Sequence, residues 1–442
     1  MRIVHLTAGT GTYHCGSCLR DATLVAGLQR LGHDALLVPL YLPPVLEDDS
    51  DGTSCPLFFG GINVYLQQRT SVFRHTPAWL DRWFDRPGLL RWAAGKMHLT
   101  TPRDLGDITL SMLAGRDGRQ RKEAEKLAEF LAARGPWDVL SISHGLLMGP
   151  APWLRQRLGA KALVCSLQGE DSFLDGLSEP WRSTAWTAVG SLLRQADALV
   201  PVSRWYGDGL AKRLDIPRDL LHPVHNGIDL EGYQPASAAD SAPTLGYLAR
   251  LCDLKGLGRL VEAFIALAPR HPRLRLLAGG ACTPQDAVYV DRLRQRLAAA
   301  GLGDRAEFRP NLSRDEKQDL LRSCTVFSVP ATYGEAFGLY VIEALACAVP
   351  VALPPSGAFP ELVAASGGGV LAADDSPAAL ATAIDRLLAD PEHARHLGEH
   401  GAAAVREHFS AQRMAEGFAA VCAAAIARPI RPIQQATPTK EH

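Results

Sequence analysis

The chain has 442 residues, of which 47% are hydrophobic and 21% are charged, the balance of a soluble globular protein. This length favours two domains over a single core. The formal net charge of -1 gives no electrostatic reason to expect nucleic acid as the main partner, and no apolar run is long enough to span a bilayer.

The amino terminus predicts a strand, a glycine-rich turn and a helix. Residues 2–8 and 34–41 have the apolar pattern of strands, and residues 19–33 carry an apolar stripe at helical spacing. A strand this close to the first residue argues against a signal peptide, so we expect a cytoplasmic protein. The nine cysteines are an odd number and, apart from one close pair, lie singly among apolar residues, which is typical of reduced thiols.

The turn "GTGTYHCG" at residues 9–16 admits three interpretations. A dinucleotide site needs a glycine where His14 stands and an acid at the end of the second strand, and the sequence has neither. His14, Cys15 and Cys18 are clustered like metal ligands or a redox pair, but no second cluster of Cys and His stands nearby in the sequence. We therefore expect no metal there, and the remaining interpretation is a loop that lines a ligand cleft.

Residues 71–96 break the alternation of strands and helices. This segment combines aromatic with basic residues, namely Trp79, Trp83, Phe84, Trp92, Arg74, Arg82, Arg86, Arg91 and Lys96. One interpretation is a pair of short helices that pack their aromatic side chains on the amino-terminal domain, the commoner role of such residues. The other is an acceptor or membrane-surface site, which would make the protein peripheral at the inner face of a membrane.

The second half repeats the alternation of short apolar strands with helix-length segments, which predicts a parallel, doubly wound sheet. Residues 233–244 are rich in Ala, Ser, Pro and Asp, as linkers are. The fold class is therefore α/β, with two Rossmann-like domains facing across a cleft. We expect an acceptor-side domain over 1–235, a nucleotide-sugar-binding domain over 240–405, a helix over 406–427 that crosses back to the first domain, and a disordered tail over 428–442.

Two acidic residues stand around the start of a predicted helix at about Leu339. Glu335 lies in the loop before this helix and Glu343 in its second turn, while Gly338 would let a ligand approach the free N–H groups of the helix start. In that arrangement one carboxylate could bind sugar hydroxyls and the other a ribose. The alternative is that Glu335 caps the helix and Glu343 is simply solvated.

Two cations follow the first strand of the second half. Arg250 and Lys255 lie at the edge of the same predicted sheet, where they could neutralise a diphosphate and stabilise it as a leaving group. Either residue alone would more often be an ordinary surface charge. Their occurrence together with the acidic pair favours a phosphate site.

This combination of motifs resembles the retaining glycosyltransferases of the group 1 superfamily (glycosyltransferase family four), which have the GT-B architecture and are related to glycogen synthases. The resemblance covers nearly the whole chain. Its motifs are Arg250-Leu251-x-x-x-Lys255-Gly256, Glu335-x-Phe337-Gly338-Leu339, Glu343-Ala344, the segment "HNGIDLEGY" at 225–233 and "FPE" at 359–361.

The resemblance implies a transferase in carbohydrate biosynthesis that retains anomeric configuration, with a nucleotide-sugar donor, a glycan, glycolipid or small-molecule acceptor, no cofactor and no bound metal. It implies front-face attack rather than a covalent intermediate. By position, Arg250 and Lys255 would bind the diphosphate, Glu335 the donor sugar and Glu343 the ribose. Backbone groups of Phe337, Gly338 and Leu339 would contact sugar and phosphate, and the glycine turn with Gly11 and Gly16 would approach the donor.

The sequence departs from the family pattern at several positions. Gln168 stands where the family often has histidine, and it can hydrogen-bond a sugar hydroxyl but cannot be protonated as histidine can. Ala249 and Ala348 stand at usual glycine positions, and Ser356-Gly357 where two glycines are common. The candidates for the acceptor side and cleft are Gln168, His144, Cys15 and Arg20. His144 could equally be structural, and Arg20, one turn into its helix, could face the cleft or solvent.

Two other functions fit the same plan. One is a nucleotide-sugar epimerase or hydrolase, which would need acids and histidines around the sugar and is disfavoured by Gln168. The other is an inactive nucleotide-sugar-binding relative, which the intact Arg250, Lys255, Glu335 and Glu343 argue against. The donor nucleotide, the sugar, the acceptor and the oligomeric state remain open at this stage.

Overall fold

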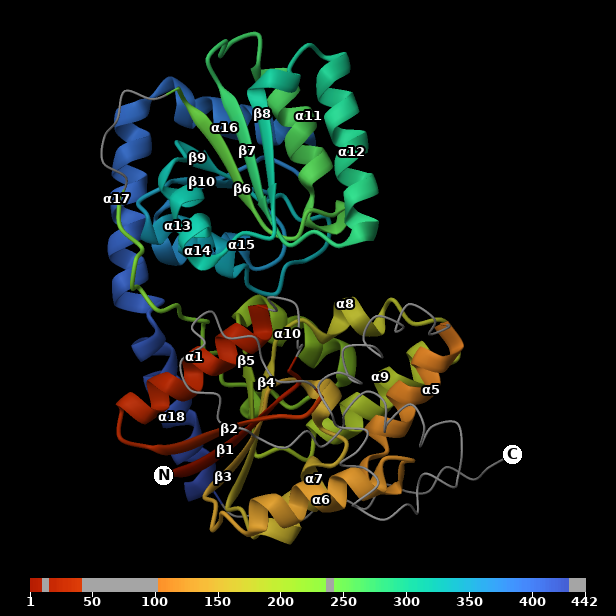
Figure 1. Cartoon of the computed structure of the whole chain (residues 1–442). Helices are drawn as coiled ribbons and strands as arrows, with labels where there is room; N and C mark the ends of the chain where they lie inside the picture. The colour runs from red at the N-terminus through yellow and green to blue at the C-terminus, as the bar shows by residue number, and fades with distance from the viewer. Residues whose placement is uncertain (10–15, 42–101, 236–241, 429–442) are drawn as a thin grey trace. The chain divides into compact units, whose positions relative to one another are not determined.

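The structure, a computed structural model, describes residues 1–9, 16–41, 102–235 and 242–428, with the side chains of residues 102–104 left out of the description. The segment 71–96, Gly11, His14, Cys15, the centre of the expected linker and most of the expected tail lie outside the described residues. The chain forms two units, each with its own parallel sheet (Figure 1).

The first unit comprises Met1–Val202, Tyr206–Val224 and the chain from Ala415 onward, and the second comprises Ser203–Trp205 and His225–Met414. The chain therefore divides at 224/225 rather than near residue 235. Where one helix was expected over 406–427, two occur, α17 (Pro391–His408) and α18 (Ala411–Ala427), and α18 belongs to the first unit from Ala415.

The first unit contains a five-stranded parallel sheet in the order β2-β1-β3-β4-β5. Its strands are mostly apolar and buried along their length, as expected where helices cover both faces of a parallel sheet. They are β1 (Arg2–Thr7), β2 (Asp34–Pro39), β3 (Val139–Ile142), β4 (Ala162–Leu167) and β5 (Ala198–Pro201).

Helices connect these strands, and the expected first helix is present as α1 (Gly16–Arg30). Leu24 and Leu28 of its predicted stripe are fully buried, while Leu31 lies just past its end and is half-buried. Besides α18, the other α-helices of this unit among the described residues are α5 (Pro102–Leu113), α6 (Arg121–Ala132), α7 (Ala151–Leu158), α8 (Glu170–Leu174), α9 (Trp181–Leu193) and α10 (Arg204–Leu214), which begins in the second unit.

The second unit contains a six-stranded parallel sheet in the order β11-β10-β9-β6-β7-β8. The strands are β6 (Thr244–Leu248), β7 (Arg275–Gly280), β8 (Ala306–Pro310), β9 (Val326–Phe327), β10 (Val351–Leu353) and β11 (Gly369–Leu371). The central strand β9 is short, and the chain leaves it as a long loop toward the next helix.

The helices of the second unit begin with recognisable sequence signals. Thr283 and Ser313 form capping boxes with the acids three residues later, and Gly338 at φ 93° precedes the helix that carries Glu343. In Figure 1, α11 lies beside α16 and α14 beside α17. The helices are α11 (Leu257–Leu267), α12 (Pro284–Ala299), α13 (Arg314–Arg322), α14 (Leu339–Ala346), α15 (Phe359–Ser366), α16 (Pro377–Ala389) and α17.

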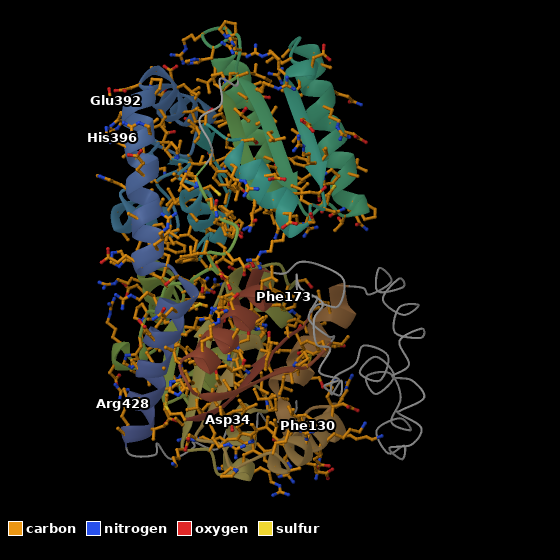
Figure 2. The ribbon with its side chains drawn as sticks, turned by 60° about the vertical axis from the view of Figure 1, so that its left-hand side comes forward. Asp34, Phe130, Phe173, Glu392, His396 and Arg428 are labelled. Atoms are coloured by element: carbon orange, nitrogen blue, oxygen red, sulfur yellow. The ribbon has the colours of Figure 1, made fainter. Side chains whose placement is uncertain are left out.

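The last helix, α18, is fixed to the first unit by its buried face and its end. Phe418 packs edge-on against His5 of β1, with ring centroids 6.3 Å apart. Arg428, labelled in Figure 2, directs its guanidinium toward the carbonyl oxygens of Asp197 and Asp219, at 3.5 and 3.3 Å. Among the helices formed by described residues, none is both long and apolar enough to cross a membrane.

Candidate active site

The second unit brings Lys255 and Glu335 together at one edge of its sheet. Lys255 ends a short 3₁₀ turn after β6, and Glu335 lies in the loop between β9 and α14. Since β6 and β9 are parallel neighbours, the loops after them share the carboxyl edge of the sheet, where ligands of such folds bind. The ammonium Nζ and the carboxylate Oε2 are 2.5 Å apart.

Two tyrosines form hydrogen bonds with this ion pair. Tyr340 and Tyr333 donate hydrogen bonds to Oε2 of Glu335, at 2.7 and 3.2 Å, and Lys255 donates to the Tyr333 hydroxyl at 2.5 Å. The ammonium also lies 5.0 Å from the Tyr333 ring centroid and 5.5 Å from that of Tyr340. Burial alone would lower the pKa of Lys255, but Glu335 and Tyr333 raise it above its usual value, so the lysine stays charged.

The hydroxyls of Tyr333 and Tyr340 also stay protonated. Burial and the nearby Glu335 carboxylate raise the pKa of Tyr333 to about 12 and that of Tyr340 well above its usual range. Both tyrosines therefore remain hydrogen-bond donors at neutral pH. Glu335 is only 9% exposed, so these hydroxyls supply much of the solvation that water would otherwise provide.

Arg250 lies after the same strand but makes a separate pair. Its Nε and Nη2 reach the two carboxylate oxygens of Asp286, at 2.9 and 3.2 Å. Asp286 is also the capping-box acid of α12, where it accepts from the backbone N–H and hydroxyl of Thr283. The Arg250 side chain is 54% exposed, so a ligand can reach the guanidinium while Asp286 holds its orientation.

The helix expected at about Leu339 is present as α14, and Gly338 directly precedes it. Gly338 adopts a left-handed conformation as the N-cap, and no side chain caps the helix, so the interpretation of Glu335 as its cap is wrong. Phe337 is 2% exposed, and Leu339 is the first helical residue. Glu343 lies in the second turn and accepts a hydrogen bond of 2.9 Å from the hydroxyl of Tyr233.

The loop before α15 supports the backbone of Glu335. Ala358 N–H donates to the carbonyl of Glu335 at 2.9 Å, and Gly357 has φ 64°. A Cβ on Gly357 would lie 2.5 Å from the backbone nitrogen of Glu335. Only glycine therefore lets this loop pack so closely, which explains the single glycine retained in Ser356-Gly357.

In the first unit, a buried carboxylate gathers polar side chains from several elements. Asp21 of α1 is fully buried, and its Oδ2 accepts from the hydroxyls of Thr7, at 2.7 Å, and Ser143. Its Oδ1 faces His5 Nε2 at 3.2 Å and Arg20 Nη1 at 3.1 Å. Burial alone would raise the pKa of Asp21, but His5, Arg20 and Ser143 hold it well below its usual value.

Gln168, which follows β4, joins the same group. Its Nε2 lies 2.8 Å from the Ser143 carbonyl, 3.2 Å from the Ser143 hydroxyl and 3.1 Å from Oδ1 of Asp21. Glu170, two residues on, accepts from the backbone N–H groups of Gln168 and Gly145 and from the hydroxyl of Tyr206. Gln168 is thus fixed through its side chain by Ser143 and Asp21 and through its backbone by Glu170.

The other expected residues of the first unit have mixed outcomes. Arg20 is 1% exposed and directs Nη1 to Asp21 and Ser166, so the expectation that it faces a cleft or solvent is wrong; Asp21 makes its burial tolerable. His144, half-buried at the end of β3, has a buried Nδ1 with no partner among the described residues, and burial lowers its pKa. Gly16 is exposed at the start of α1.

No group of three or more His, Cys, Asp or Glu residues suited to a metal ion occurs in the described part of the chain. Sequence reasoning missed Tyr333, Tyr340, Asp286 and Asp21. Tyr333 could have been noticed because it lies two residues before Glu335, and Asp21 because it follows Arg20 inside an apolar helix. Nothing local to Asp286 indicates its contact with Arg250, 36 residues away.

Comparison with known proteins agrees with this architecture. Residues 109–231 match the family described as Glycosyltransferase Family 4, and residues 234–404 match Glycosyl transferases group 1. A D-inositol 3-phosphate glycosyltransferase from Streptomyces bingchenggensis is 32% identical over 310 residues, 66% of this chain and 68% of that protein. The lipopolysaccharide core mannosyltransferase LpcC of Rhizobium leguminosarum is 32% identical over 253 residues, 54% of this chain and 67% of that protein.

Solved structures show the same fold. Sucrose-phosphate synthase from Thermosynechococcus elongatus superposes with a TM-score of 0.70 at 20% identity, covering 97% of this chain and 99% of that one. HepE of Anabaena, solved with UDP, gives 0.67 at 17% identity over 96% and 100%. The expected α/β fold with two Rossmann-like sheets is therefore confirmed. The family matches identify the class of reaction as glycosyl transfer. The chain belongs to the group 1 glycosyltransferases and is a sugar-transferring enzyme.

Proposed function

We propose that this protein is a retaining, metal-independent glycosyltransferase that moves a sugar from a nucleoside-diphosphate sugar to an acceptor hydroxyl. The observation that supports the proposal is the Lys255–Glu335 pair, a cation beside a carboxylate at the carboxyl edge of the sheet. Gly338, the left-handed N-cap of α14, carries no side chain at this helix start, where free backbone N–H groups and the helix dipole would stabilise an anion.

In this proposal, different residues bind different parts of the donor. Lys255 and Arg250 bind the diphosphate and supply positive charge as the leaving group forms, which is the role a divalent metal plays elsewhere. Glu335 accepts hydrogen bonds from hydroxyls of the transferred sugar, and Glu343 binds the ribose. Backbone groups of Phe337, Gly338 and Leu339 contact the sugar and the phosphate.

In the proposed reaction, the bond between the anomeric carbon and the phosphate oxygen breaks, and its electron pair leaves on the diphosphate. The acceptor oxygen bonds to the anomeric carbon on the same face. The acceptor proton passes to an oxygen of the departing phosphate, so no protein nucleophile is required. Lys255, protonated at neutral pH, stabilises the charge that develops on that phosphate.

The similar proteins indicate the classes of substrate to test first. HepE was solved with UDP and UDP-glucose, and the relatives in sequence are named for inositol phosphate, maltose 1-phosphate and lipopolysaccharide core. For this chain we therefore propose a nucleotide-sugar donor and an acceptor that is a sugar, a sugar phosphate or a glycolipid. We also propose a cytoplasmic location, with a glycolipid acceptor requiring contact with a membrane surface.

The test is a donor panel. Purified protein is incubated with UDP-, ADP- and GDP-sugars, with and without acceptors, in EDTA, and nucleoside diphosphate release and product anomeric configuration are measured. We expect one donor to be used, with retention, and Lys255→Ala and Glu335→Gln to lose most activity while melting as the wild type does. Near-normal turnover in both variants, an inverted product or a strict metal requirement would contradict the corresponding part of the proposal.

A further inference from the structure

We infer that Gln168 presents its amide carbonyl as a fixed hydrogen-bond acceptor for one sugar hydroxyl, and that Asp21 is the positioning residue that fixes this orientation. The inference rests on the proposed function, because it assigns a specificity element to the same reaction. It starts from the buried group around Asp21, which lies in the first unit and which the chemistry at Lys255 and Glu335 does not use.

The neighbours of Gln168 decide which way its amide points. The two groups nearest its terminal nitrogen are the Ser143 carbonyl and Oδ1 of Asp21, at 2.8 and 3.1 Å, and both can only accept hydrogen bonds. The reverse orientation would place the amide oxygen against these two acceptors. Both amide hydrogens are therefore used inward, and the NH₂ group has none left for a ligand.

Asp21 is held as an acceptor by its own surroundings. Thr7, Ser143 and Arg20 donate hydrogen bonds to its two oxygens, and His5 Nε2 lies 3.2 Å from Oδ1. These neighbours keep the carboxylate ionised inside the protein. An ionised carboxylate cannot donate to Gln168. The orientation of the glutamine amide thus follows from a charge buried beneath it.

The outward atom defines what can bind. Oε1 of Gln168 accepts no hydrogen bond from any described residue, and it is not a buried atom. Gln168 directly follows β4, at the carboxyl edge of the first sheet, where ligands of parallel α/β folds bind. A carbonyl oxygen there attracts a hydroxyl, which can donate, and it disfavours a phosphate, an ether or a fluorine, which cannot.

The hydroxyl belongs either to the transferred sugar or to the acceptor, and analogues distinguish the two. A series of donors and a series of acceptors, each with one hydroxyl replaced by fluorine, are assayed with the wild type and with Gln168→Leu. We expect one position in one series to lower wild-type kcat/KM by about tenfold, the effect of one neutral hydrogen bond, and to have no effect in Gln168→Leu. The matched control, Gln195→Leu, alters a half-buried glutamine of the same unit whose amide donates, among the described residues, only to the Ser191 carbonyl.

The role of Asp21 is tested through the same readout. Asp21→Asn is expected to abolish the difference in kcat/KM between the hydroxyl and the fluorine substrate at that one position. The double variant Asp21→Asn with Gln168→Leu is expected to show the same kcat/KM ratio as Gln168→Leu alone. If Asp21→Asn does not fold, Ser143→Ala replaces it, because the Ser143 hydroxyl lies between Asp21 and Gln168. It is expected to reduce the same discrimination.

The outcomes separate this inference from the proposed function. If the wild type transfers sugar and Gln168→Leu shows the same hydroxyl-to-fluorine ratio of kcat/KM as the wild type, this inference is overturned while the proposed function stands. Discrimination that survives in Asp21→Asn and in Ser143→Ala overturns the positioning role. A wild type that neither binds nor transfers any sugar overturns the proposed function and this inference together.

Discussion

Lys255 and Glu335 form an ion pair in the second unit, with 2.5 Å between ammonium and carboxylate. In the proposed reaction both have other partners, since the lysine binds the diphosphate and the glutamate binds the sugar. A nucleoside diphosphate must therefore compete with Glu335 for Lys255. When it succeeds, Tyr333 and Tyr340 remain to solvate the released carboxylate, which is then available to sugar hydroxyls.

This competition predicts that Glu335→Gln binds the nucleoside diphosphate more tightly than the wild type while losing turnover. Removing the negative charge frees Lys255 from a charge-assisted hydrogen bond, and we expect an affinity gain of about tenfold. Titration calorimetry with the diphosphate of the active donor measures it. Glu262→Gln is the control, because Glu262 pairs with Arg296 on the exposed surface of the same unit. Unchanged or weaker binding by Glu335→Gln would show that the pair does not oppose the phosphate.

Gly357→Ala is predicted to impair catalysis through the backbone of Glu335. Its new Cβ would approach the Glu335 nitrogen to 2.5 Å, and a shift of about 1 Å in a substrate-binding group costs on the order of 100-fold in rate. Gly367→Ala is the matched control, with φ 59° and no atom within 4 Å of the added Cβ. Both variants should lose about 1–2 kcal/mol of unfolding free energy from backbone strain. Gly357→Ala should lose more, because its Cβ also overlaps the backbone of Glu335. Only Gly357→Ala should lose activity in steady-state assays, and equal activity in the two variants would contradict the support role.

The sequence predicted the elements of the site better than the contacts between them. The helix at Leu339, the preceding loop with Glu335 and the strand before Arg250 follow from local apolar patterns and glycine positions. The Lys255–Glu335 contact joins residues 80 apart, and the Asp21–Gln168 contact residues 147 apart, so both depend on strand order rather than on local pattern. The error at Arg20 has the same origin, since arginine is usually exposed and its burial becomes visible only with Asp21 and Ser166 around it.

Ala348→Gly is predicted to stabilise the protein. Ala348 has φ 57° just after α14, and the backbone N–H of Val349 returns to the carbonyl of Ala344, the pattern of a helix end that favours glycine. Relief of the left-handed strain outweighs the extra chain entropy of glycine, so we expect a gain of up to about 1 kcal/mol. Ala346→Gly, within the same helix, should instead lose about 1 kcal/mol. Denaturant unfolding of both variants gives the signs, and destabilisation in both would contradict the argument.

Asp21→Asn is predicted to destabilise the first unit in a pH-dependent way. It leaves the buried Arg20 guanidinium without its carboxylate, which should cost about 3–5 kcal/mol at neutral pH. The folded-state pKa of Asp21 lies below its unfolded value, so its stabilisation is complete above the unfolded pKa of about 3.9 and is lost as the pH falls toward the folded value. The difference in unfolding free energy between wild type and Asp21→Asn should therefore narrow as the pH falls below about 4. Asp34, labelled in Figure 2, forms an exposed ion pair with Arg2, and Asp34→Asn should cost less than about 1 kcal/mol. A difference for Asp21→Asn that stays constant down to pH 3 would mean that the ionised carboxylate is not what holds this group together.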